Sequence, residues 1–374
     1  MSIYIDVSAA VHKRAGLGRY AESLVRALVQ REPGRFALFH NRESGFQPLK
    51  GLEDIPTRSV PLGYKPWRMV VWLGQLARVG FDRLLPGAEL FHATEHLLLP
   101  LRHAPTVLTV HDLIYHLFPQ HHKRLNYWYL SLTMPLYCRR ADAIITVSES
   151  SKRDLERCYG VPPDKVTVVY EAAAPRFRPA TPEAIAAARR RYNLPERYVI
   201  YVGTIEPRKN LVRLLETMRL LHEKRETIKL VIVGGLGWLY EDFLHYLEEM
   251  PSGNVIMLGY VPDEDLPALY SGAALFALPS LYEGFGLTVL EAMACGTPVV
   301  CSRTSSLPEI AGDAAVYFDP TDVQEMAEVM HQVLNDEERQ EEMRARGLVQ
   351  AAQFSWSRAA EETMAVYQQL IATP

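Results

Sequence analysis

Two glutamates flank a glycine-rich turn in the segment Pro279-Ser-Leu-Tyr-Glu-Gly-Phe-Gly-Leu-Thr-Val-Leu-Glu-Ala-Met-Ala-Cys-Gly-Thr-Pro298. A strand is expected to end near Leu278, and a helix is expected from the turn to about Cys295, where Gly296 caps it. Backbone N–H groups at the start of such a helix suit phosphate or sugar hydroxyls. The two carboxylates are too far apart for a hydrolase pair. We therefore expect one elongated polar ligand to be bound by Glu283, Gly284, Phe285, Gly286, Leu287 and Glu291.

Two adjacent cations follow a proline in the segment Tyr201-Val-Gly-Thr-Ile-Glu-Pro-Arg-Lys-Asn-Leu211. Gly203 ends a predicted strand, and Arg208 with Lys209 precedes a predicted helix. A guanidinium fork beside an ammonium group can hold a diphosphate. Because the glutamate turn is predicted on a neighbouring strand, the two segments together indicate a nucleotide-diphosphate site. We expect Glu283 and Lys209 to lie near a cleft surface, where their replacement has little effect on folding.

These segments resemble those of the retaining nucleotide-sugar glycosyltransferases of family four. The segment with Arg208 and Lys209 is most similar to that of the bacterial mannosyltransferases in this family. The family hallmark is a glutamate, seven residues and a second glutamate, which Glu283 and Glu291 match. The resemblance covers nearly the whole chain and extends to further segments: the first-domain glycine loop with Gly16 and Gly18, the strand-end Val110-His111-Asp112, Thr146-Val-Ser148 and the terminal Phe354-Ser-Trp356.

The resemblance implies a role for each matching residue. Glu283 contacts sugar hydroxyls, Glu291 the nucleotide ribose, Arg208 and Lys209 the diphosphate, and His111 lies near the sugar. It thus assigns catalysis to His111, Glu283, Arg208 and Lys209, and donor binding to Gly16, Gly18, Gly203, Gly284, Phe285, Gly286, Leu287 and Glu291. Two positions depart from the family pattern: Thr204 stands where many members carry arginine, and Glu171-Ala172 stands where many carry Asn-Gly.

The implied reaction is transfer of a hexose, mannose from GDP-mannose, to a hydroxyl of a glycan or lipid-linked acceptor, with retained configuration and with no metal and no cofactor. The acceptor attacks on the face that the diphosphate leaves. A UDP-sugar donor and a non-catalytic nucleotide-sugar-binding subunit stay open as alternatives. The sequence does not identify the acceptor, the linkage or the oligomeric state.

Three other patterns could indicate a dinucleotide-binding or a metal-binding protein, but each lacks a feature that such a site needs. Gly16-Leu-Gly-Arg-Tyr-Ala21 matches a dinucleotide fingerprint, but it stands apart from the first strand and no acidic residue follows the second, where Asn41 stands. Asp263-Glu-Asp265 resembles a metal-binding D-x-D motif, yet it directly precedes a helix, where acidic residues are stabilising. The scattered histidines lack ligand spacing, so no metal site is assigned: His92, His96, His116, His121 and His122.

The expected elements alternate between strand and helix, which indicates parallel sheets covered on both faces. The expected strands cover residues 3–7, 36–40, 90–92, 106–110, 143–147, 166–170, 198–202, 229–233, 255–258, 275–277, 299–301 and 315–318, with helices at 18–30, 211–224 and 240–250. Three prolines between Pro175 and Pro182 form a linker. We therefore expect two facing, doubly wound Rossmann-like domains of GT-B architecture around an interdomain cleft. They span residues 1–175, on the acceptor side, and 176–354, which bind the donor. Residues 355–374 form a helix that crosses back.

Composition is that of a globular enzyme: 374 residues, 48% hydrophobic, 22% charged and a net charge of −4. Residues 1–180 carry 24 Lys+Arg and 16 Asp+Glu, a balance of +8, which leaves −12 for the remainder. No apolar run is long enough to span a bilayer, no signal peptide is visible and the four cysteines lack metal spacing, so we expect a cytoplasmic protein. The basic half lacks nucleic-acid motifs, so no nucleic-acid partner is expected.

An amphipathic segment in the basic half predicts peripheral contact with an anionic membrane. The residues from Lys65 to Arg83 combine tryptophans, aliphatic side chains and cations at helical spacing. His121-His-Lys-Arg-Leu-Asn-Tyr-Trp-Tyr129 forms a second basic-aromatic patch. At about 1 kcal/mol per basic residue, such a surface gives reversible, salt-sensitive attachment to the inner membrane face. The alternative is that Trp67, Trp72 and Leu76 pack the helix onto the core.

Overall fold

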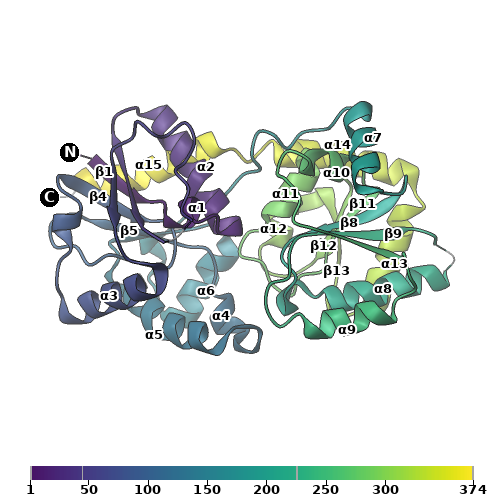
Figure 1. Ribbon diagram of the computed structural model, residues 1–374, viewed down its shortest axis with the longest axis horizontal. Helices are drawn as coiled ribbons and strands as arrows, with labels where there is room; N and C mark the ends of the chain where they lie inside the picture. The colour runs from purple at the N-terminus through teal and green to yellow at the C-terminus, as the bar shows by residue number, and fades with distance from the viewer. Residues whose placement is uncertain (1, 44, 225, 373–374) are drawn as a thin grey trace. The chain divides into compact units, whose positions relative to one another are not determined.

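The computed structural model describes residues 2–43, 45–224 and 226–372, so the ends of the predicted domain ranges, residues 1 and 373–374, lie outside it. The chain divides into two compact units. The first contains residues 1–117, 124–171 and 355–374; the second contains residues 118–123 and 172–354. Each unit is a parallel sheet with helices packed on it (Figure 1).

The first unit is built on a seven-stranded sheet in the order β3-β2-β1-β4-β5-β6-β7. Its strands are β1 (Ser2–Asp6), β2 (Phe36–Asn41), β3 (Thr57–Val60), β4 (Ala88–Ala93), β5 (Thr106–Val110), β6 (Ala143–Thr146) and β7 (Val166–Val168). Its helices are α1 (Ser8–Val11), α2 (Ala15–Arg31), α3 (Tyr64–Ala77), α4 (Ile114–Leu117), α5 (Arg124–Arg140), α6 (Glu149–Tyr159) and α15 (Trp356–Ala372).

The second unit is built on a six-stranded sheet in the order β10-β9-β8-β11-β12-β13. Its strands are β8 (Tyr198–Val202), β9 (Lys229–Val233), β10 (Val255–Gly259), β11 (Leu275–Leu278), β12 (Val299–Ser302) and β13 (Ala315–Phe318). Its helices are α7 (Pro182–Tyr192), α8 (Leu211–Glu223), α9 (Glu241–Glu249), α10 (Leu266–Ser271), α11 (Leu287–Ala294), α12 (Leu307–Ala311), α13 (Val323–Leu334) and α14 (Glu337–Ala351).

Both sheets are parallel, and their central strands are buried along their whole length. Every residue of β5, β8, β11 and β12 is buried, as expected for strands covered by helices on both faces. The predicted layout of two doubly wound, Rossmann-like units is confirmed. In each sheet the strand order reverses once, between β1 and β4 and between β8 and β11. Ligands of open α/β sheets bind at the carboxyl ends of the strands beside such a reversal.

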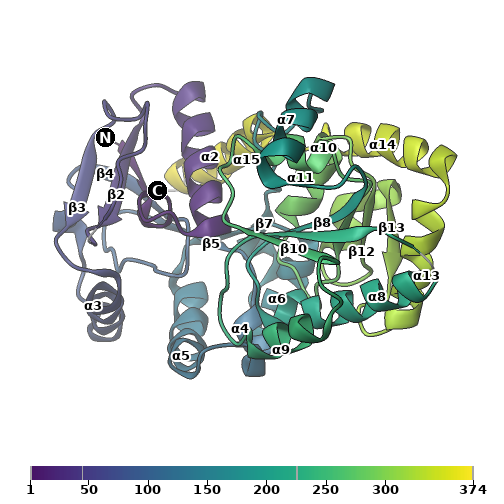
Figure 2. The same ribbon diagram turned by 45° about the vertical axis from the view of Figure 1, so that its right-hand side comes forward.

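The last helix of the chain packs on the first unit. α15 lies beside α2 in both views (Figure 1 and Figure 2), and the Tyr367 hydroxyl lies 2.6 Å from Nδ1 of His92 on β4. No helix in the described part of the chain has the length and apolar character needed to span a bilayer.

Candidate active site

The strand reversal of the second sheet brings the two predicted donor-binding segments together. A 3₁₀ turn over Pro207–Lys209 follows β8, and the glutamate turn follows β11. Asn210 joins them: its backbone is left-handed, with φ of 59°, and its side-chain amide donates to the Pro279 carbonyl at 3.0 Å. The Leu281 amide donates to the Arg208 carbonyl at 2.9 Å. These bonds fix the cations against the glutamate turn.

Glu283 is the centre of this cluster. Its carboxylate accepts hydrogen bonds from Ser280 Oγ at 2.6 Å, Lys209 Nζ at 2.5 Å and Arg208 Nη1 at 2.9 Å. Burial alone raises the pKa of Glu283, but Lys209 and Arg208 outweigh it and lower that pKa to about 2. The sequence predicted the glutamate turn on a strand next to the one that carries both cations. The structure shows that the Glu283 carboxylate is bonded to both of them.

Glu283 is more deeply buried than the two cations it binds. Glu283 is 8% exposed, and the side chains of Arg208 and Lys209 are each 14% exposed. Arg208 also pairs with Glu206, which is 5% exposed. The cluster holds two carboxylates and two cations, so removal of one carboxylate leaves a buried charge poorly compensated, which destabilises a fold strongly. Sequence reasoning missed the contributions of Glu206 and Ser280, because neither belongs to the glutamate pair or the cation pair.

The glycine-rich turn opens α11 as predicted. Gly286 caps the helix with φ of 105°, a conformation that favours glycine. Ser306 Oγ donates to the Phe285 carbonyl at 2.7 Å and to the Glu283 carbonyl at 2.9 Å, which holds the turn against the segment after β12. Gly284 and Leu287 lie in the same turn. Glu291 lies inside α11 and is buried, and it accepts a hydrogen bond from the Tyr270 hydroxyl at 3.1 Å.

His111 lies in the first unit at the carboxyl end of β5. Its Nε2 is 3.0 Å from the Thr94 carbonyl, and its Nδ1 is 3.3 Å from Oε1 of Glu171. Both ring nitrogens therefore face acceptors, and only the imidazolium can donate to both at once. Burial lowers the pKa of His111, but the hydrogen bond and charge of Glu171 outweigh it, and the net shift is upward. Glu171, which departs from the family pattern, is thus the partner of His111.

A second charged group at the carboxyl edge of the first sheet was not predicted. Arg14 donates two hydrogen bonds to Glu95, at 3.0 and 2.8 Å. Asp6, at the end of β1, is 1% exposed, and its burial and the charge of Glu95 raise its pKa to about 7. These residues have no motif spacing in the sequence, because the sheet brings them together from β1, the start of α2 and the end of β4.

The glycine segment of the first unit is part of a helix, so the expected start of that helix was wrong. Gly16 and Gly18 lie in the first turn of α2, which begins at Ala15 rather than at Gly18. A Cβ at Gly18 would lie 2.8 Å from the Ala9 carbonyl oxygen, whereas one at Gly16 would meet no atom within 4 Å. Packing of α2 against α1 therefore requires glycine at Gly18. Gly203 ends β8, where Gly234 of the next strand packs so closely that a Cβ there would clash with the Gly203 carbonyl.

The acidic residues before α10 are held in ion pairs. Asp263 pairs with Arg176 and Asp265 with Arg191, each at 2.7 Å. This arrangement fits their interpretation as structural residues at a helix start. No group of three or more histidine, cysteine, aspartate or glutamate side chains suited to hold a metal ion occurs among the described residues.

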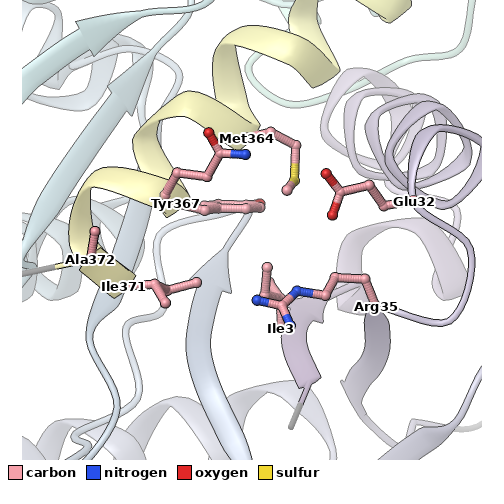
Figure 3. A pocket seen from close by; sticks show the side chains of 8 residues that line it. Ile3, Glu32, Arg35, Met364, Tyr367, Ile371 and Ala372 are labelled. Atoms are coloured by element: carbon pink, nitrogen blue, oxygen red, sulfur yellow. The ribbon is translucent and has the colours of Figure 1, made fainter.

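A cavity of about 470 Å³ in the first unit lies away from the predicted site (Figure 3). Glu32 and Arg35 line one side, and Met364, Tyr367 and Ile371 of α15 line the other (Figure 3). Ile3 marks the amino end of β1, opposite the strand ends that bind ligands in such folds. None of the predicted site residues lines this cavity.

Comparison with known proteins matches both units to glycosyltransferase families. Residues 14–175 match the family described as Glycosyltransferase Family 4, and residues 185–349 match the family described as Glycosyl transferases group 1. Over 386 aligned residues the chain is 34% identical to the O-antigen chain mannosyltransferase B of Escherichia coli, covering 99% of this chain and 100% of that protein.

Solved structures share the fold at lower identity. Sucrose-phosphate synthase from Thermosynechococcus elongatus aligns with a TM-score of 0.81 at 23% identity over 100% of both chains. Anabaena HepE in complex with UDP and glucose aligns with a TM-score of 0.76 at 19% identity, over 99% of this chain and 100% of that one. Both similarities concern the architecture.

Proposed function

Because the chain belongs to glycosyltransferase family four and is a glycosyltransferase with the GT-B fold, we propose that it transfers mannose from GDP-mannose to a hydroxyl of a glycan, with retained configuration. The acceptor we propose is a growing O-antigen-type polysaccharide or its lipid-linked precursor. Support for mannose and for this acceptor comes from the 34% identity, over the full chain, to a mannosyltransferase of O-antigen synthesis.

The buried cluster around Glu283 is the observation that carries the proposed reaction. Departure of the diphosphate concentrates negative charge on its oxygens, and Arg208 with Lys209 is placed to stabilise that charge. Glu283 keeps both cations in fixed positions through bonds of 2.9 and 2.5 Å. In the proposed reaction Glu283 also accepts hydrogen bonds from the donor sugar, and Glu291 from the ribose. On the strength of the family resemblance, we assign His111 to the donor sugar as well.

Retention follows in this proposal from attack on the face that the leaving group vacates. A donor phosphate oxygen takes the proton of the acceptor hydroxyl, so that no protein carboxylate is needed as a nucleophile. The carboxylate at the centre of the cluster is already bonded to two cations and Ser280. Such a carboxylate is a weak nucleophile and a weak base, because its pKa is lowered to about 2.

A panel of nucleotides and donors tests the proposal. We expect GDP to raise the melting temperature more than UDP, and nicotinamide dinucleotides to leave it unchanged. We expect transfer from GDP-mannose to continue in EDTA, because we assign no metal ligand. Stabilisation by UDP with transfer from UDP-glucose would favour the alternative donor. GDP binding without transfer to any mannose-terminated acceptor would favour a non-catalytic subunit. Loss of activity in EDTA, restored by Mn²⁺, would contradict metal independence.

We also propose that the protein acts at the cytoplasmic face of an anionic membrane through an apolar surface on α3 and α5. This α3–α5 surface consists of exposed large side chains: Met69, Val70, Leu73, Leu76, Val79, Leu125, Trp128 and Leu132. Trp67 and Val71 on the opposite face of α3 are buried. The helix therefore both packs on the core and exposes an apolar stripe, so the two interpretations of this segment are compatible.

Six cations lie within or close to α3 and α5 in the sequence. In the described part of the chain, none of them forms an ion pair with a carboxylate: Lys65, Arg78, Arg83, Lys123, Arg124 and Arg139. The two helices are joined by Arg68, which donates to Asn126 at 3.1 Å. At about 1 kcal/mol for each basic residue near an anionic surface, these six cations support reversible attachment. A membrane partner of this kind suits a lipid-linked acceptor.

A further inference from the structure

The segment Phe118–Lys123 belongs to the second unit although its neighbours in sequence belong to the first. The Trp238 indole nitrogen donates to the His121 carbonyl at 2.6 Å. The Phe118 ring lies 6.1 Å from the ring of Tyr282, next to Glu283 in sequence, and stacks on the His121 ring at 5.6 Å. These contacts hold His121 at the edge of the Arg208 cluster.

Two buried polar atoms in this region have no hydrogen-bond partner in the described part of the chain: Oε2 of Glu206 and Nδ1 of His121. Oε1 of Glu206 accepts from Arg208, so the second oxygen is the unsatisfied half of a carboxylate whose side chain is 95% or more buried. A buried polar atom without a partner destabilises the fold. Such atoms at a functional site point to a ligand that supplies the missing bonds.

The two side chains lie close enough for their charges to interact. Burial lowers the pKa of His121, the charge of Arg208 lowers it further, and the charge of Glu206 raises it. Glu206 and His121 therefore both lie near the guanidinium of Arg208. Nothing in the sequence indicated this pair, because His121 has no ligand spacing and Glu206 lies inside the cation motif.

We propose that Glu206 and His121 form the subsite that binds hydroxyl groups of the acceptor sugar; this proposal rests on the proposed transferase activity. A carboxylate oxygen without a donor requires an O–H or N–H group, and His121 Nδ1 can donate or accept. A second phosphate would be repelled by Glu206. The neighbouring rings of Phe118, Trp238 and Tyr282 supply the apolar contacts that the C–H faces of a sugar ring need.

The position favours the acceptor over the donor. Both oxygens of Glu283 are bonded to cations at the proposed donor sugar site, whereas Oε2 of Glu206 is unsatisfied beside the same Arg208. If the acceptor attacks from the side of the departing diphosphate, its reacting hydroxyl must lie beside the cations that hold that diphosphate. Glu206 and His121 then hold the neighbouring hydroxyls and orient the reacting one.

Steady-state kinetics of the full-length protein test the subsite with His121→Ala and Glu206→Gln. In Glu206→Gln the amide oxygen can still accept from Arg208, but the charge paired with that guanidinium is lost. His121→Ala leaves the ion pairs of Arg208 and Lys209 in place, so it is the variant that separates the acceptor from the diphosphate. We expect the KM for a mannose-terminated oligosaccharide to rise at least about tenfold, as loss of one or two hydrogen bonds to a ligand does. In His121→Ala the Kd for GDP and the slow hydrolysis of GDP-mannose in water should stay within about twofold of wild type.

His245→Ala is the matched control, because His245 lies on α9 with a side chain that is 80% exposed. It should leave every constant unchanged. An unchanged acceptor KM in both test variants would overturn the subsite, and so would a loss of GDP affinity in His121→Ala equal to its rise in acceptor KM. If the wild-type protein hydrolyses and transfers no nucleotide sugar, the proposed function itself fails. If the wild-type protein transfers the sugar but both variants have the wild-type acceptor KM, the proposed function holds and the subsite alone fails.

Discussion

Glu283 organises the cluster because one carboxylate accepts from Ser280, Arg208 and Lys209 at once. Each partner fixes a side chain that would otherwise sample many rotamers. In Glu283→Gln the amide keeps the shape of the side chain but loses the charge that orients both cations. We expect kcat to fall by roughly two orders of magnitude or more, as when a preorganised charge is removed. Transfer assays measure this effect.

The control for this variant is its stability. Because the amide oxygen can still accept from one of the two cations, Glu283→Gln should unfold at a temperature closer to wild type than Glu283→Ala, in which Arg208 and Lys209 both lose that partner. A wild-type kcat in Glu283→Gln would show that the charge of Glu283 has no role in the reaction. The same outcome for Lys209→Ala would remove the proposed diphosphate site.

The pair of His111 and Glu171 predicts a pH dependence. Glu171 raises the pKa of His111, and Asp112 and the Thr94 carbonyl act in the same direction. The stability contributed by protonated His111 is therefore present below its unfolded pKa of about 6.5, and it is lost as pH rises through the higher folded pKa. In Glu171→Gln we expect the alkaline limb of kcat/KM to move to lower pH.

The profile of kcat/KM between about pH 5 and pH 9 measures this shift, and NMR titration of His111 gives its pKa directly. Tyr20, whose ring meets His111 edge-on at 4.6 Å, and His92, whose pKa is lowered to about 3, stay uncharged in this range. They contribute no competing titration. An alkaline limb that does not move in Glu171→Gln would show that Glu171 only packs against the ring.

Among the elements, α3 is unusual because two of its faces are apolar. Leu73 and Leu76 are 55% and 54% exposed, and Leu125 on α5 is 87% exposed. The double variant Leu73→Asn and Leu76→Asn removes apolar area from the α3–α5 surface without touching the core. We expect it to bind anionic vesicles of phosphatidylglycerol at least about tenfold more weakly than wild type at low salt, with unchanged melting temperature.

Sedimentation with phosphatidylglycerol and phosphatidylcholine vesicles measures this binding. The matched control is the double variant Leu348→Asn and Val349→Asn on α14. It also removes exposed apolar side chains, but the neighbouring Arg344 and Arg346 are paired with carboxylates. If wild-type protein ignores anionic vesicles at low salt, the α3–α5 surface is not a membrane contact. Equal weakening by both double variants would indicate general apolar adhesion.

Elements with strong local signals were predictable from the sequence. The strands β5, β8, β9 and β13 have the predicted bounds, because each is a short apolar run ended by glycine or a polar residue. β3 was missed, because Thr57-Arg-Ser-Val60 is a polar edge strand that is mostly exposed. The start of α2 was placed three residues late, because Gly16 and Gly18 have low helix propensity. Close packing against α1 nevertheless requires glycine at Gly18.

Site residues were predictable where they form a motif and not where only the fold unites them. Glu283, Arg208 and Lys209 stand in recognisable segments whose strands are neighbours in the sheet. Glu171 and His111, in contrast, are far apart in sequence and meet because β5 and β7 end at the same edge. A local sequence pattern cannot predict this pair, because the order of the strands in the sheet brings the two residues together.

At the scale of the whole molecule, the two units are not continuous in sequence. α15 packs on α2, and its buried residues include Ala360, Met364 and Tyr367. A chain that ends at Phe354 therefore exposes the apolar face of α2 and leaves the buried His92 without its Tyr367 partner. We expect its first unit to lose protection against hydrogen exchange while residues 172–354 keep theirs.

Hydrogen exchange followed by mass spectrometry resolves the two units separately. Tyr367→Phe is the milder comparison: it removes only the hydroxyl and should weaken the first unit by about 1 kcal/mol. Equal loss of protection in both units of the truncated chain would mean that they unfold as one. Full protection of the first unit without α15 would mean that this helix adds nothing to its stability.

The placement of α15 also has a consequence for biosynthesis. Every residue of the second unit leaves the ribosome before α15 does, although α15 completes the first unit. The nascent first unit therefore waits with the α15-facing side of α2 uncovered while more than one hundred and eighty residues are translated. At about 5–20 residues per second, that interval lasts roughly 10 to 40 seconds, long enough for chaperones to bind the exposed face. The first unit can therefore complete its fold only after the second unit has been synthesised, whereas the second unit does not depend on α15.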